Sequence, residues 1–235
     1  GRLQSSELTL LGPDVHPIVK QLPLEDNTDD NPGAILSIYQ ILSLAERRMR
    51  VLLIATNRHH RLMSRMDARP LPIGLAYVAG HLDQNRHSLK VLDLMFSDDY
   101  LADVEDTVKE FQPEMVGISI RNLGNHSYID PQWALPTSKE VIDKVRSLSS
   151  AKIVVGGPAF NFLPKECFSY MGPDLGIAGD GGETFAELAD LLDSNNPYEH
   201  LSGLVYRENG EVVFNGVRAR SGFAKPPRFE DLDME

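Results

Sequence analysis

The chain has 235 residues, of which 42% are hydrophobic and 24% charged, the composition of a globular domain. Its apolar runs fall short of the roughly 20 residues that a membrane-spanning helix needs, and we expect neither a membrane span nor a secretory segment. The formal net charge of −11 is not overridden by any local basic stripe, so nucleic acid is not expected as a partner. The default localisation is cytoplasmic.

Cys167 is the only cysteine of the sequence. A single cysteine excludes an internal disulfide framework, a cysteine-rich zinc site and an iron–sulfur cluster held by this chain alone. The chain opens on Gly1 and ends in an acidic stretch over residues 229–235. We interpret it as a fragment of something longer.

Three segments are expected along the chain. Residues 1–48 contain several prolines and a polar run, followed by a helical pattern over residues 34–48, and predict a leader or linker with one helix. An α/β domain is predicted over residues 49–200. A hairpin and a linker to a missing downstream domain are predicted over residues 201–235.

From residue 50 onward, short apolar runs alternate with helical patterns, and continuous apolar runs are typical of strands buried on both faces. The expected strands cover residues 50–56, 89–93, 115–120, 152–155 and 175–178, and the expected helices cover residues 73–84, 101–111, 138–148, 164–170 and 184–194. This alternation predicts a flavodoxin-like (Rossmann-like) α/β fold, with a five-stranded parallel sheet and helices on both faces. Two short runs around Glu208-Asn-Gly210 predict a C-terminal β-hairpin.

Ligands of such sheets bind beyond the carboxyl ends of the strands, where helix N-termini point inward. The third expected strand ends in Ser119, Arg121 and Asn122, which place a hydroxyl, a guanidinium and an amide at this edge. These groups would bind a ligand, or would cap loops and the next helix. The run as a whole favours binding.

Glycines follow the fourth and fifth expected strands. Gly156-Gly157-Pro158 permits close approach of a ligand to the backbone, or forms a tight turn. The second run consists of Gly179, Asp180, Gly181, Gly182 and Glu183, and its two acids are suited to the N-terminus of the following helix. The first βα turn lacks G-x-G-x-x-G, which disfavours a Rossmann dinucleotide site.

Other side chains have both a functional and a structural interpretation. His59 and His60 would ligate a metal, but nothing at metal-ligand spacing accompanies them, so solvated loop histidines are favoured. Cys167 is expected in the core rather than as a nucleophile. Tyr128 and Trp133 would shield a planar ligand or pack their loop onto the domain.

The loops, taken in order, resemble the cobalamin-binding domain of cobalamin-dependent radical S-adenosylmethionine proteins. The matching pieces are Pro72-Ile-Gly74-Leu-Ala-Tyr77-Val-Ala79, His87-Ser-Leu-Lys-Val-Leu-Asp93, Pro113-Glu-Met-Val-Gly117-Ile-Ser119-Ile-Arg121-Asn122, Ile153-Val-Val-Gly156-Gly157-Pro158-Ala-Phe160, Pro164-Lys-Glu166 and Asp174-Leu-Gly-Ile-Ala-Gly179-Asp-Gly-Gly-Glu183. The resemblance extends from about residue 50 to residue 207.

The resemblance implies a cobalamin bound face-on above the strand ends, with its nucleotide tail inserted beside the sheet. Ser119 would meet the tail, Gly156 and Gly157 would make room for it, and residues 179–182 would border the corrin ring or the tail. Arg121 and Asn122 would contact corrin amides or the tail. Asn57, Pro158 and Glu183 complete the implied cofactor-binding set.

Two departures from related families limit the implied chemistry. The D-x-H-x-x-G signature of methionine-synthase-like domains is missing, so the resemblance implies base-off binding without a protein histidine on cobalt, with His59 or His60 as the alternative. The C-x-x-x-C-x-x-C motif is also absent. The chain would thus hold no complete active site. The iron–sulfur cluster and S-adenosylmethionine would belong to a radical domain acting in cis or in trans, in methyl transfer or related radical chemistry.

Two other functions stay open from the residues. A nucleotide- or flavin-binding enzyme domain would use the glycine loops as phosphate cradles. A receiver-like signalling domain would need acidic residues where Thr56-Asn57 and Ser119 stand, which disfavours it.

Overall fold

The computed structural model describes residues 48–57, 71–124, 128–129, 131, 133–218 and 225–232, and every element below belongs to the unit Met49–Glu235. The helix expected over residues 34–48 and the histidines His59 and His60 lie outside the described residues. The division of the chain into three segments therefore stays a prediction.

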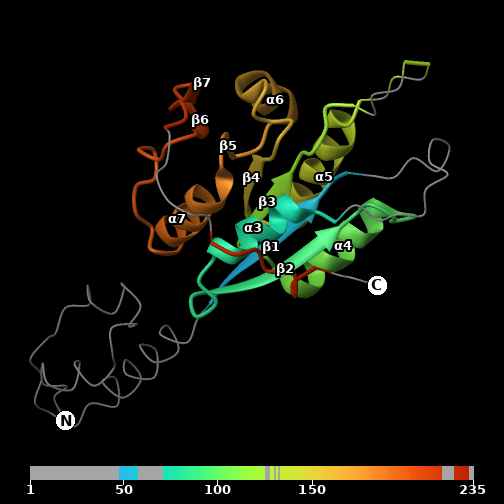
Figure 1. Cartoon of the computed structure of the whole chain (residues 1–235), viewed down its shortest axis with the longest axis horizontal. Helices are drawn as coiled ribbons and strands as arrows, with labels where there is room; N and C mark the ends of the chain where they lie inside the picture. Colours follow the sequence, from blue (N-terminus) through green and yellow to red (C-terminus); the bar gives the residue numbers. More distant parts are fainter. Residues whose placement is uncertain are drawn as a thin grey trace, which may run out of the picture. The chain divides into compact units, whose positions relative to one another are not determined.

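A seven-stranded sheet forms the centre of the unit (Figure 1). In chain order its strands are β1 (Met49–Ala55), β2 (His87–Asp93), β3 (Met115–Ser119), β4 (Lys152–Gly156), β5 (Leu175–Ile177), β6 (Leu204–Glu208) and β7 (Glu211–Phe214). Their spatial order is β2-β1-β3-β4-β5-β6-β7, and the first five strands are parallel. The flavodoxin-like order predicted from the alternating pattern is confirmed.

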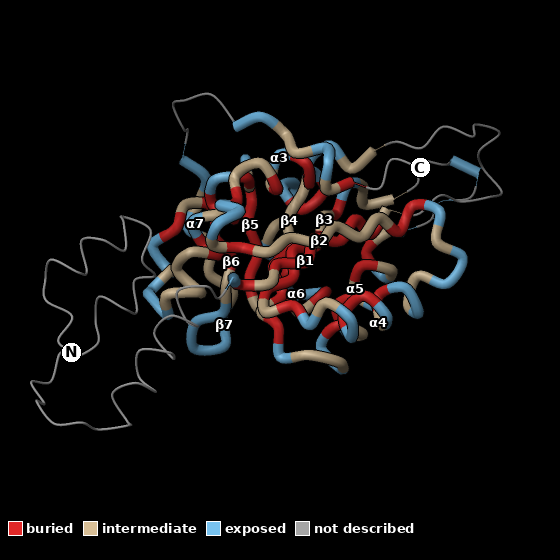
Figure 2. Tube along the Cα trace, turned by 90° about the horizontal axis from the view of Figure 1, so that it is seen from below, coloured by how far each residue is buried: buried red, intermediate tan, exposed pale blue. Residues whose placement is uncertain are grey.

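Helices cover both faces of this sheet (Figure 2). Helices α3 (Ile73–His81) and α7 (Gly181–Asp193) pack on one face, and α4 (Tyr100–Phe111), α5 (Leu135–Leu148) and α6 (Pro164–Met171) pack on the other. Side chains alternate along β1, so Leu52 and Ile54 join the core under α4, α5 and α6 while Val51 and Leu53 face α3 and α7. Burial on both faces explains why the strand is an unbroken apolar run.

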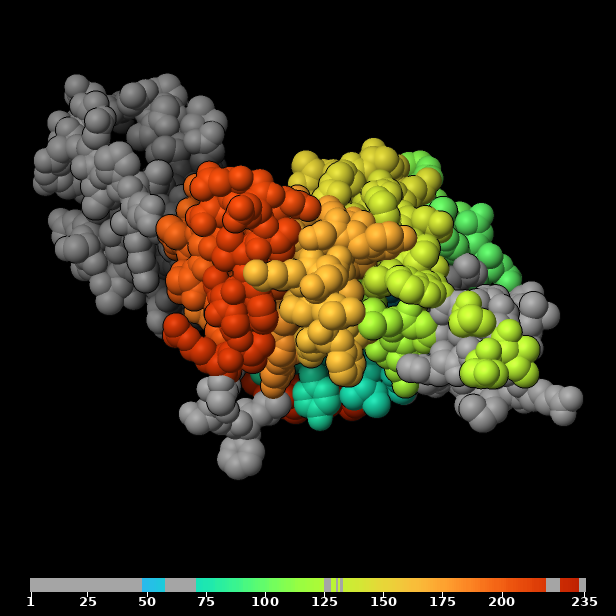
Figure 3. Space-filling model, turned by 90° about the horizontal axis from the view of Figure 1, so that it is seen from above, coloured from blue at the N-terminus to red at the C-terminus, as the bar shows by residue number. Residues whose placement is uncertain are grey.

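The C-terminal hairpin extends the sheet beyond its parallel part. Strand β6 pairs antiparallel with β5, and β7 pairs antiparallel with β6. On the face shown in Figure 3, the hairpin lies beside α6, where the Arg207 guanidinium carbon stands 5.8 Å from the centre of the Phe168 ring. The hairpin thus covers the outer edge of β5, which is only three residues long.

The observed helix ends differ slightly from the expected ones, for local reasons. Helix α7 begins at Gly181 because the Asp180 carboxylate accepts a hydrogen bond from the Gly182 amide. Asp99 caps α4 in the same way, with the Ala102 amide 3.1 Å from its Oδ1. Among the described residues, no helix combines the length and apolarity that crossing a bilayer requires.

Candidate functional site

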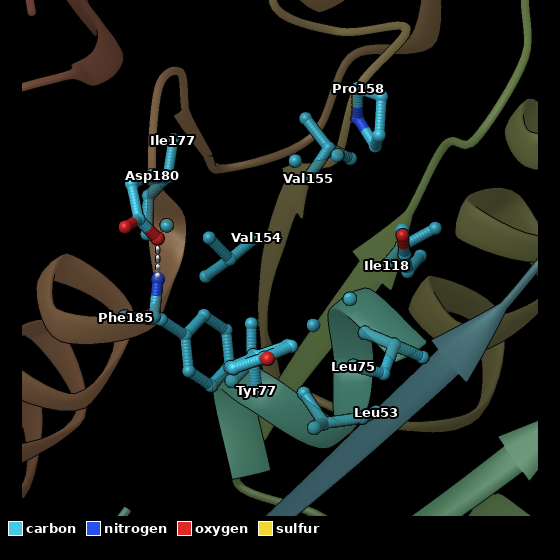
Figure 4. A pocket seen from close by; sticks show the side chains of 18 of the residues that line it. Leu53, Leu75, Tyr77, Ile118, Val154, Val155, Pro158, Ile177, Asp180 and Phe185 are labelled. Carbon is cyan, nitrogen blue, oxygen red and sulfur yellow. Dashed lines mark hydrogen bonds between the residues drawn. The ribbon is translucent and has the colours of Figure 1, made fainter. Parts of the chain in front are cut away.

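A cavity of about 450 Å³ opens at the carboxyl ends of the central strands, between α3 and α7 (Figure 4). We call it the edge cavity. Its lining is mostly apolar and consists of Leu53, Gly74, Leu75, Tyr77, Val78, His81, Gly117, Ile118, Ser119, Val154, Val155, Gly156, Gly157, Pro158, Asn161, Ile177, Gly179, Asp180, Gly181, Gly182 and Phe185. A concave apolar site with few polar groups, at this edge of an open parallel sheet, suits a cofactor.

A glycine in the middle of β3 lets two apolar side chains pack against the strand at the inner end of the cavity. A methyl carbon built on Gly117 would lie 2.7 Å from Leu53 Cδ2 and 2.8 Å from Phe185 Cε2. Figure 4 shows Leu53 and Phe185 facing the cavity from β1 and α7. Any other residue at position 117 would push these two side chains apart or fill the space between them.

Gly157 shapes the sheet side of the cavity. Its φ of +105° is a conformation that side-chain-bearing residues rarely adopt. A methyl carbon there would also lie 2.7 Å from the Ile120 carbonyl oxygen and 3.0 Å from Ser119 Oγ. The Ile120 amide in turn donates to the Gly156 carbonyl over 2.8 Å. The paired glycines therefore let the loop after β4 turn close against the end of β3.

Two loops at the cavity mouth are tied together by Asn161. Its Oδ1 accepts from the Gly179 amide at 2.8 Å, and its Nδ2 donates to the Gly179 carbonyl at 3.4 Å. Asp180, which follows Gly179, accepts a hydrogen bond from the Gly182 amide over 3.5 Å. The N-terminus of α7 thus already holds a carboxylate, which competes with any phosphate for that position.

Hydroxyl groups fix the end of β3 beside β1. Thr56 is buried, and its Oγ1 lies 2.8 Å from Ser138 Oγ on α5 and 3.2 Å from the Ser119 carbonyl. This arrangement fixes the backbone of Ser119, whose side chain lines the edge cavity. Ser119 is therefore a positioned polar group in an apolar wall.

Most of the residues predicted from sequence meet at this cavity. Eight of them line it, namely Ser119, Gly156, Gly157, Pro158, Gly179, Asp180, Gly181 and Gly182. Four others are not part of the lining, namely Asn57, Arg121, Asn122 and Glu183. Arg121 and Glu183 are exposed, and Asn57 follows β1 at the same edge of the sheet. The binding roles of all twelve residues stay predictions.

Sequence reasoning missed the wall that α3 and α7 supply. Tyr77, Val78 and His81 face the cavity from α3, and Phe185 faces it from α7. The isolated glycine inside the third apolar run, Gly117, was the one available signal, because such a glycine often marks close approach of other groups.

The remaining candidates divide between core and surface. Cys167 is 2% exposed, and burial raises the pKa of its thiol, so it is a core residue as predicted. Tyr128 is 100% exposed and Trp133 is 73% exposed, so neither packs its loop onto the domain. Within the described ranges, no cluster of three or more His, Cys, Asp or Glu side chains is arranged to hold a metal ion.

The fold and the edge cavity together define a class, that of α/β domains that bind a cofactor at the carboxyl edge of a parallel sheet. Comparison with known protein families matches residues 62–189 to the family described as B12 binding domain. The chain belongs to this family. Cobalamin, predicted as the cofactor from sequence, is confirmed by this match.

The chain is similar to two methyltransferases over part of its length. The chain is 30% identical to an uncharacterized methyltransferase of Pyrococcus horikoshii over 145 residues, and 30% identical to the tryptophan 2-C-methyltransferase of Streptomyces laurentii over 146 residues. Each match covers 60% of this chain but only 29% and 24% of the respective relative. The chain thus spans less than a third of the relatives' length.

Among solved structures, the radical S-adenosylmethionine methyltransferase TsrM of Kitasatospora setae, with cobalamin and a [4Fe-4S] cluster bound, superposes with a TM-score of 0.65. It is 23% identical, and the match covers 77% of this chain and 31% of that one. The cobalamin-dependent S-adenosylmethionine radical enzyme OxsB gives a TM-score of 0.59 at 18% identity, over 78% of this chain and 24% of that one. These likenesses establish the shared fold.

Proposed function

We propose that the chain binds cobalamin with the nucleotide tail in the edge cavity and the corrin ring across the strand ends, as the cofactor-binding part of a radical S-adenosylmethionine methyltransferase. The observation that carries this is the mostly apolar cavity of about 450 Å³ at the carboxyl ends of β3, β4 and β5, where methyl carbons on Gly117, Gly157 and Gly182 would each meet a protein atom within 2.9 Å. An apolar cavity whose walls pack this closely at glycines fits an inserted planar group. Membership of the B12 binding domain family supports the same ligand.

The residues of this chain would bind and orient the cofactor, and cobalamin would supply a cobalt centre that carries a methyl group. Ser119 would donate a hydrogen bond to the tail, and the apolar wall would exclude water from it. Arg121 and Asn122, at the end of β3, would contact the corrin amides from outside the cavity. A radical domain, in cis or in trans, would supply the cluster and S-adenosylmethionine.

We further propose that His81, the histidine in the lining of the cavity, does not bind cobalt. His81 lines the cavity, but its Nδ1 lies 2.8 Å from the Tyr77 carbonyl and its Nε2 accepts from the Lys225 amide over 3.4 Å. Both ring nitrogens are therefore engaged. His59 and His60 lie outside the described residues, so the prediction of base-off binding without a histidine ligand rests on sequence for those two.

The test is direct binding to the full chain. The folded protein is mixed with hydroxocobalamin, desalted, and examined for retained corrinoid absorbance, with flavin mononucleotide in a parallel sample. Retention of the corrinoid alone is expected. A folded sample that retains none would contradict the proposal, and retention of flavin instead would favour a nucleotide- or flavin-binding domain. After reduction to cob(II)alamin, electron paramagnetic resonance without nitrogen superhyperfine splitting would support the absence of a histidine ligand.

A further inference from the structure

The last described segment of the chain, residues 225–232, lies along α3 and is called the strap here (Figure 1). The Arg228 amide donates to the Ala76 carbonyl of α3 over 2.9 Å. Farther along, Arg228 Nη2 donates to Asp231 Oδ1 over 3.0 Å, and Leu232 is only 6% exposed. The strap is therefore packed onto the domain, where the sequence predicted a linker.

A glycine of α3 receives the strap. A methyl carbon built on Gly80 would lie 2.1 Å from the carbonyl oxygen of Pro226, a backbone atom that cannot swing aside as a side chain does. The helix and the strap therefore touch backbone to backbone. No other residue type at position 80 would allow the observed approach.

His81 links the strap to the edge cavity. Because the Tyr77 carbonyl only accepts hydrogen bonds, the His81 Nδ1 at 2.8 Å must carry the ring proton, which leaves Nε2 to accept from the Lys225 amide at 3.4 Å. Lys225 Nζ also lies 3.4 Å from the His81 carbonyl. On the α7 side, a methyl carbon on Gly182 would be 2.6 Å from His81 Nδ1. The ring thus stands between the strap and the first turn of α7.

We propose that the strap is a positioning element for the cofactor: it holds α3 and His81 at the distance from α7 that the cobalamin tail requires. This inference rests on the proposed function, because the tail is assigned to the cavity between these two helices. A docked strap keeps the cavity wall preorganised, so strap docking and corrinoid binding favour each other. Coupling of this kind is reciprocal, and bound corrinoid must stabilise the strap by the same factor.

The experiment compares the full-length wild type with two variants, with hydroxocobalamin as the probe. Gly80→Ala expels the strap from the helix side, and Leu232→Ser removes its buried anchor without touching α3. Glu230→Gln is the matched control, because Glu230 lies on the strap but is exposed, and Arg228 keeps its closer ion pair with Asp231 at 2.8 Å when the one with Glu230 at 3.5 Å is lost. Alanine ordinarily favours a helix more than glycine does, so unfolding of α3 would not explain a loss of binding by Gly80→Ala.

Two readouts are needed: the dissociation constant from equilibrium dialysis, and the deuterium uptake of residues 225–232 by hydrogen exchange. If expulsion leaves the competent arrangement populated about a tenth of the time, the apparent dissociation constant rises about tenfold in both variants. Their straps should exchange faster, while Glu230→Gln matches wild type. In the wild type, hydroxocobalamin should slow exchange in the strap.

Different failures have different meanings. A wild type that binds no hydroxocobalamin would overturn the proposed function and the coupling together. A wild type that binds, with variants that exchange faster but bind equally well, would overturn the coupling alone. If neither variant changes exchange, Gly80 and Leu232 do not hold the strap on α3, and the positioning proposal fails. Unchanged exchange in the wild-type strap on binding of hydroxocobalamin would overturn the coupling.

Discussion

Gly74 offers a way to fill the edge cavity without disturbing the fold. It is exposed in the first turn of α3 and lines the cavity, and a methyl carbon built on it meets no atom within 4 Å. Gly74→Leu therefore places about four carbon atoms in open space at the cavity wall. Since leucine is a much better helix former than glycine, we expect the free energy of unfolding to stay the same or rise by up to about 1 kcal/mol.

The expected effect on binding follows from the volume that the leucine occupies. Each apolar carbon that the cofactor tail can no longer bury removes about 0.8 kcal/mol of binding free energy. A leucine side chain therefore costs about 3 kcal/mol, or about a hundredfold in the dissociation constant of hydroxocobalamin. Gly74→Ala adds one carbon and should weaken binding only about fourfold.

Equilibrium dialysis with hydroxocobalamin measures the dissociation constants, and thermal unfolding followed by circular dichroism confirms that both variants are folded. The graded loss from glycine through alanine to leucine is the expected signature. A folded Gly74→Leu protein that binds the corrinoid as tightly as wild type would refute the assignment of the tail to this cavity.

Three further outcomes follow from the structure. Gly157 has a φ of +105°, so Gly157→Ala should lower the free energy of unfolding by about 2 kcal/mol. The melting temperature should then fall by about 4–8 °C, and an unchanged melting temperature would contradict the strain argument. Lys109 and Lys144 hold the pKa of Glu105 at about 2, so this carboxylate contributes stability above about pH 4.5 that is lost as the pH falls through about 2. Glu105→Gln should therefore lower the melting temperature at pH 7, and lower it less near pH 2 and at high salt. A difference in melting temperature that is the same under all these conditions would exclude this ion pair as the cause. Cys167 is buried with a raised thiol pKa, so Ellman's reagent should label it slowly in the native chain and promptly in denaturant, and rapid native labelling would show that the thiol is accessible.

The sheet and the strand-end side of the cavity could be predicted from sequence because both depend on local signals. Unbroken apolar runs such as residues 50–55 identify strands buried on both faces, and right-handed crossovers leave few possible strand orders. The same topology places the ends of β3, β4 and β5 at one edge, so the glycines at Gly156 and Gly179 were expected to meet. Local sequence was sufficient for residues such as Ser119 and Gly156, which are the last residues of their strands, but not for Arg121 and Asn122 in the loop beyond.

The helical wall could not be predicted, since it depends on how α3 rotates against α7. Helix α3 is apolar on nearly all sides, so its pattern does not distinguish the face toward the sheet from the face toward the cavity. Tyr77 and His81 point into the site only because α7 approaches closely at Gly182. Tertiary packing, rather than propensity, decides such residues.

The strap was predicted as linker for a related reason. Two prolines at Pro226 and Pro227, followed by acidic residues, are typical of an exposed connection, and the sequence near them shows no regular period. What holds the segment is a distant glycine, Gly80, and the buried side chain of Leu232. Neither partner is visible from the local sequence of the segment.

The contact between His81 and Lys225 joins residues that are 144 positions apart. During synthesis the chain emerges from its N-terminus, so the whole sheet, including the hairpin, can pair before the strap is available to close. Once the hairpin is in place, only the short stretch between β7 and the strap remains to be closed, so docking costs little loop entropy but has to wait until Lys225 and the residues after it are made. A nascent chain halted just before Lys225 would therefore have its strands in place while α3 still lacked its outer support, and the cofactor site would be the last part of the domain to mature.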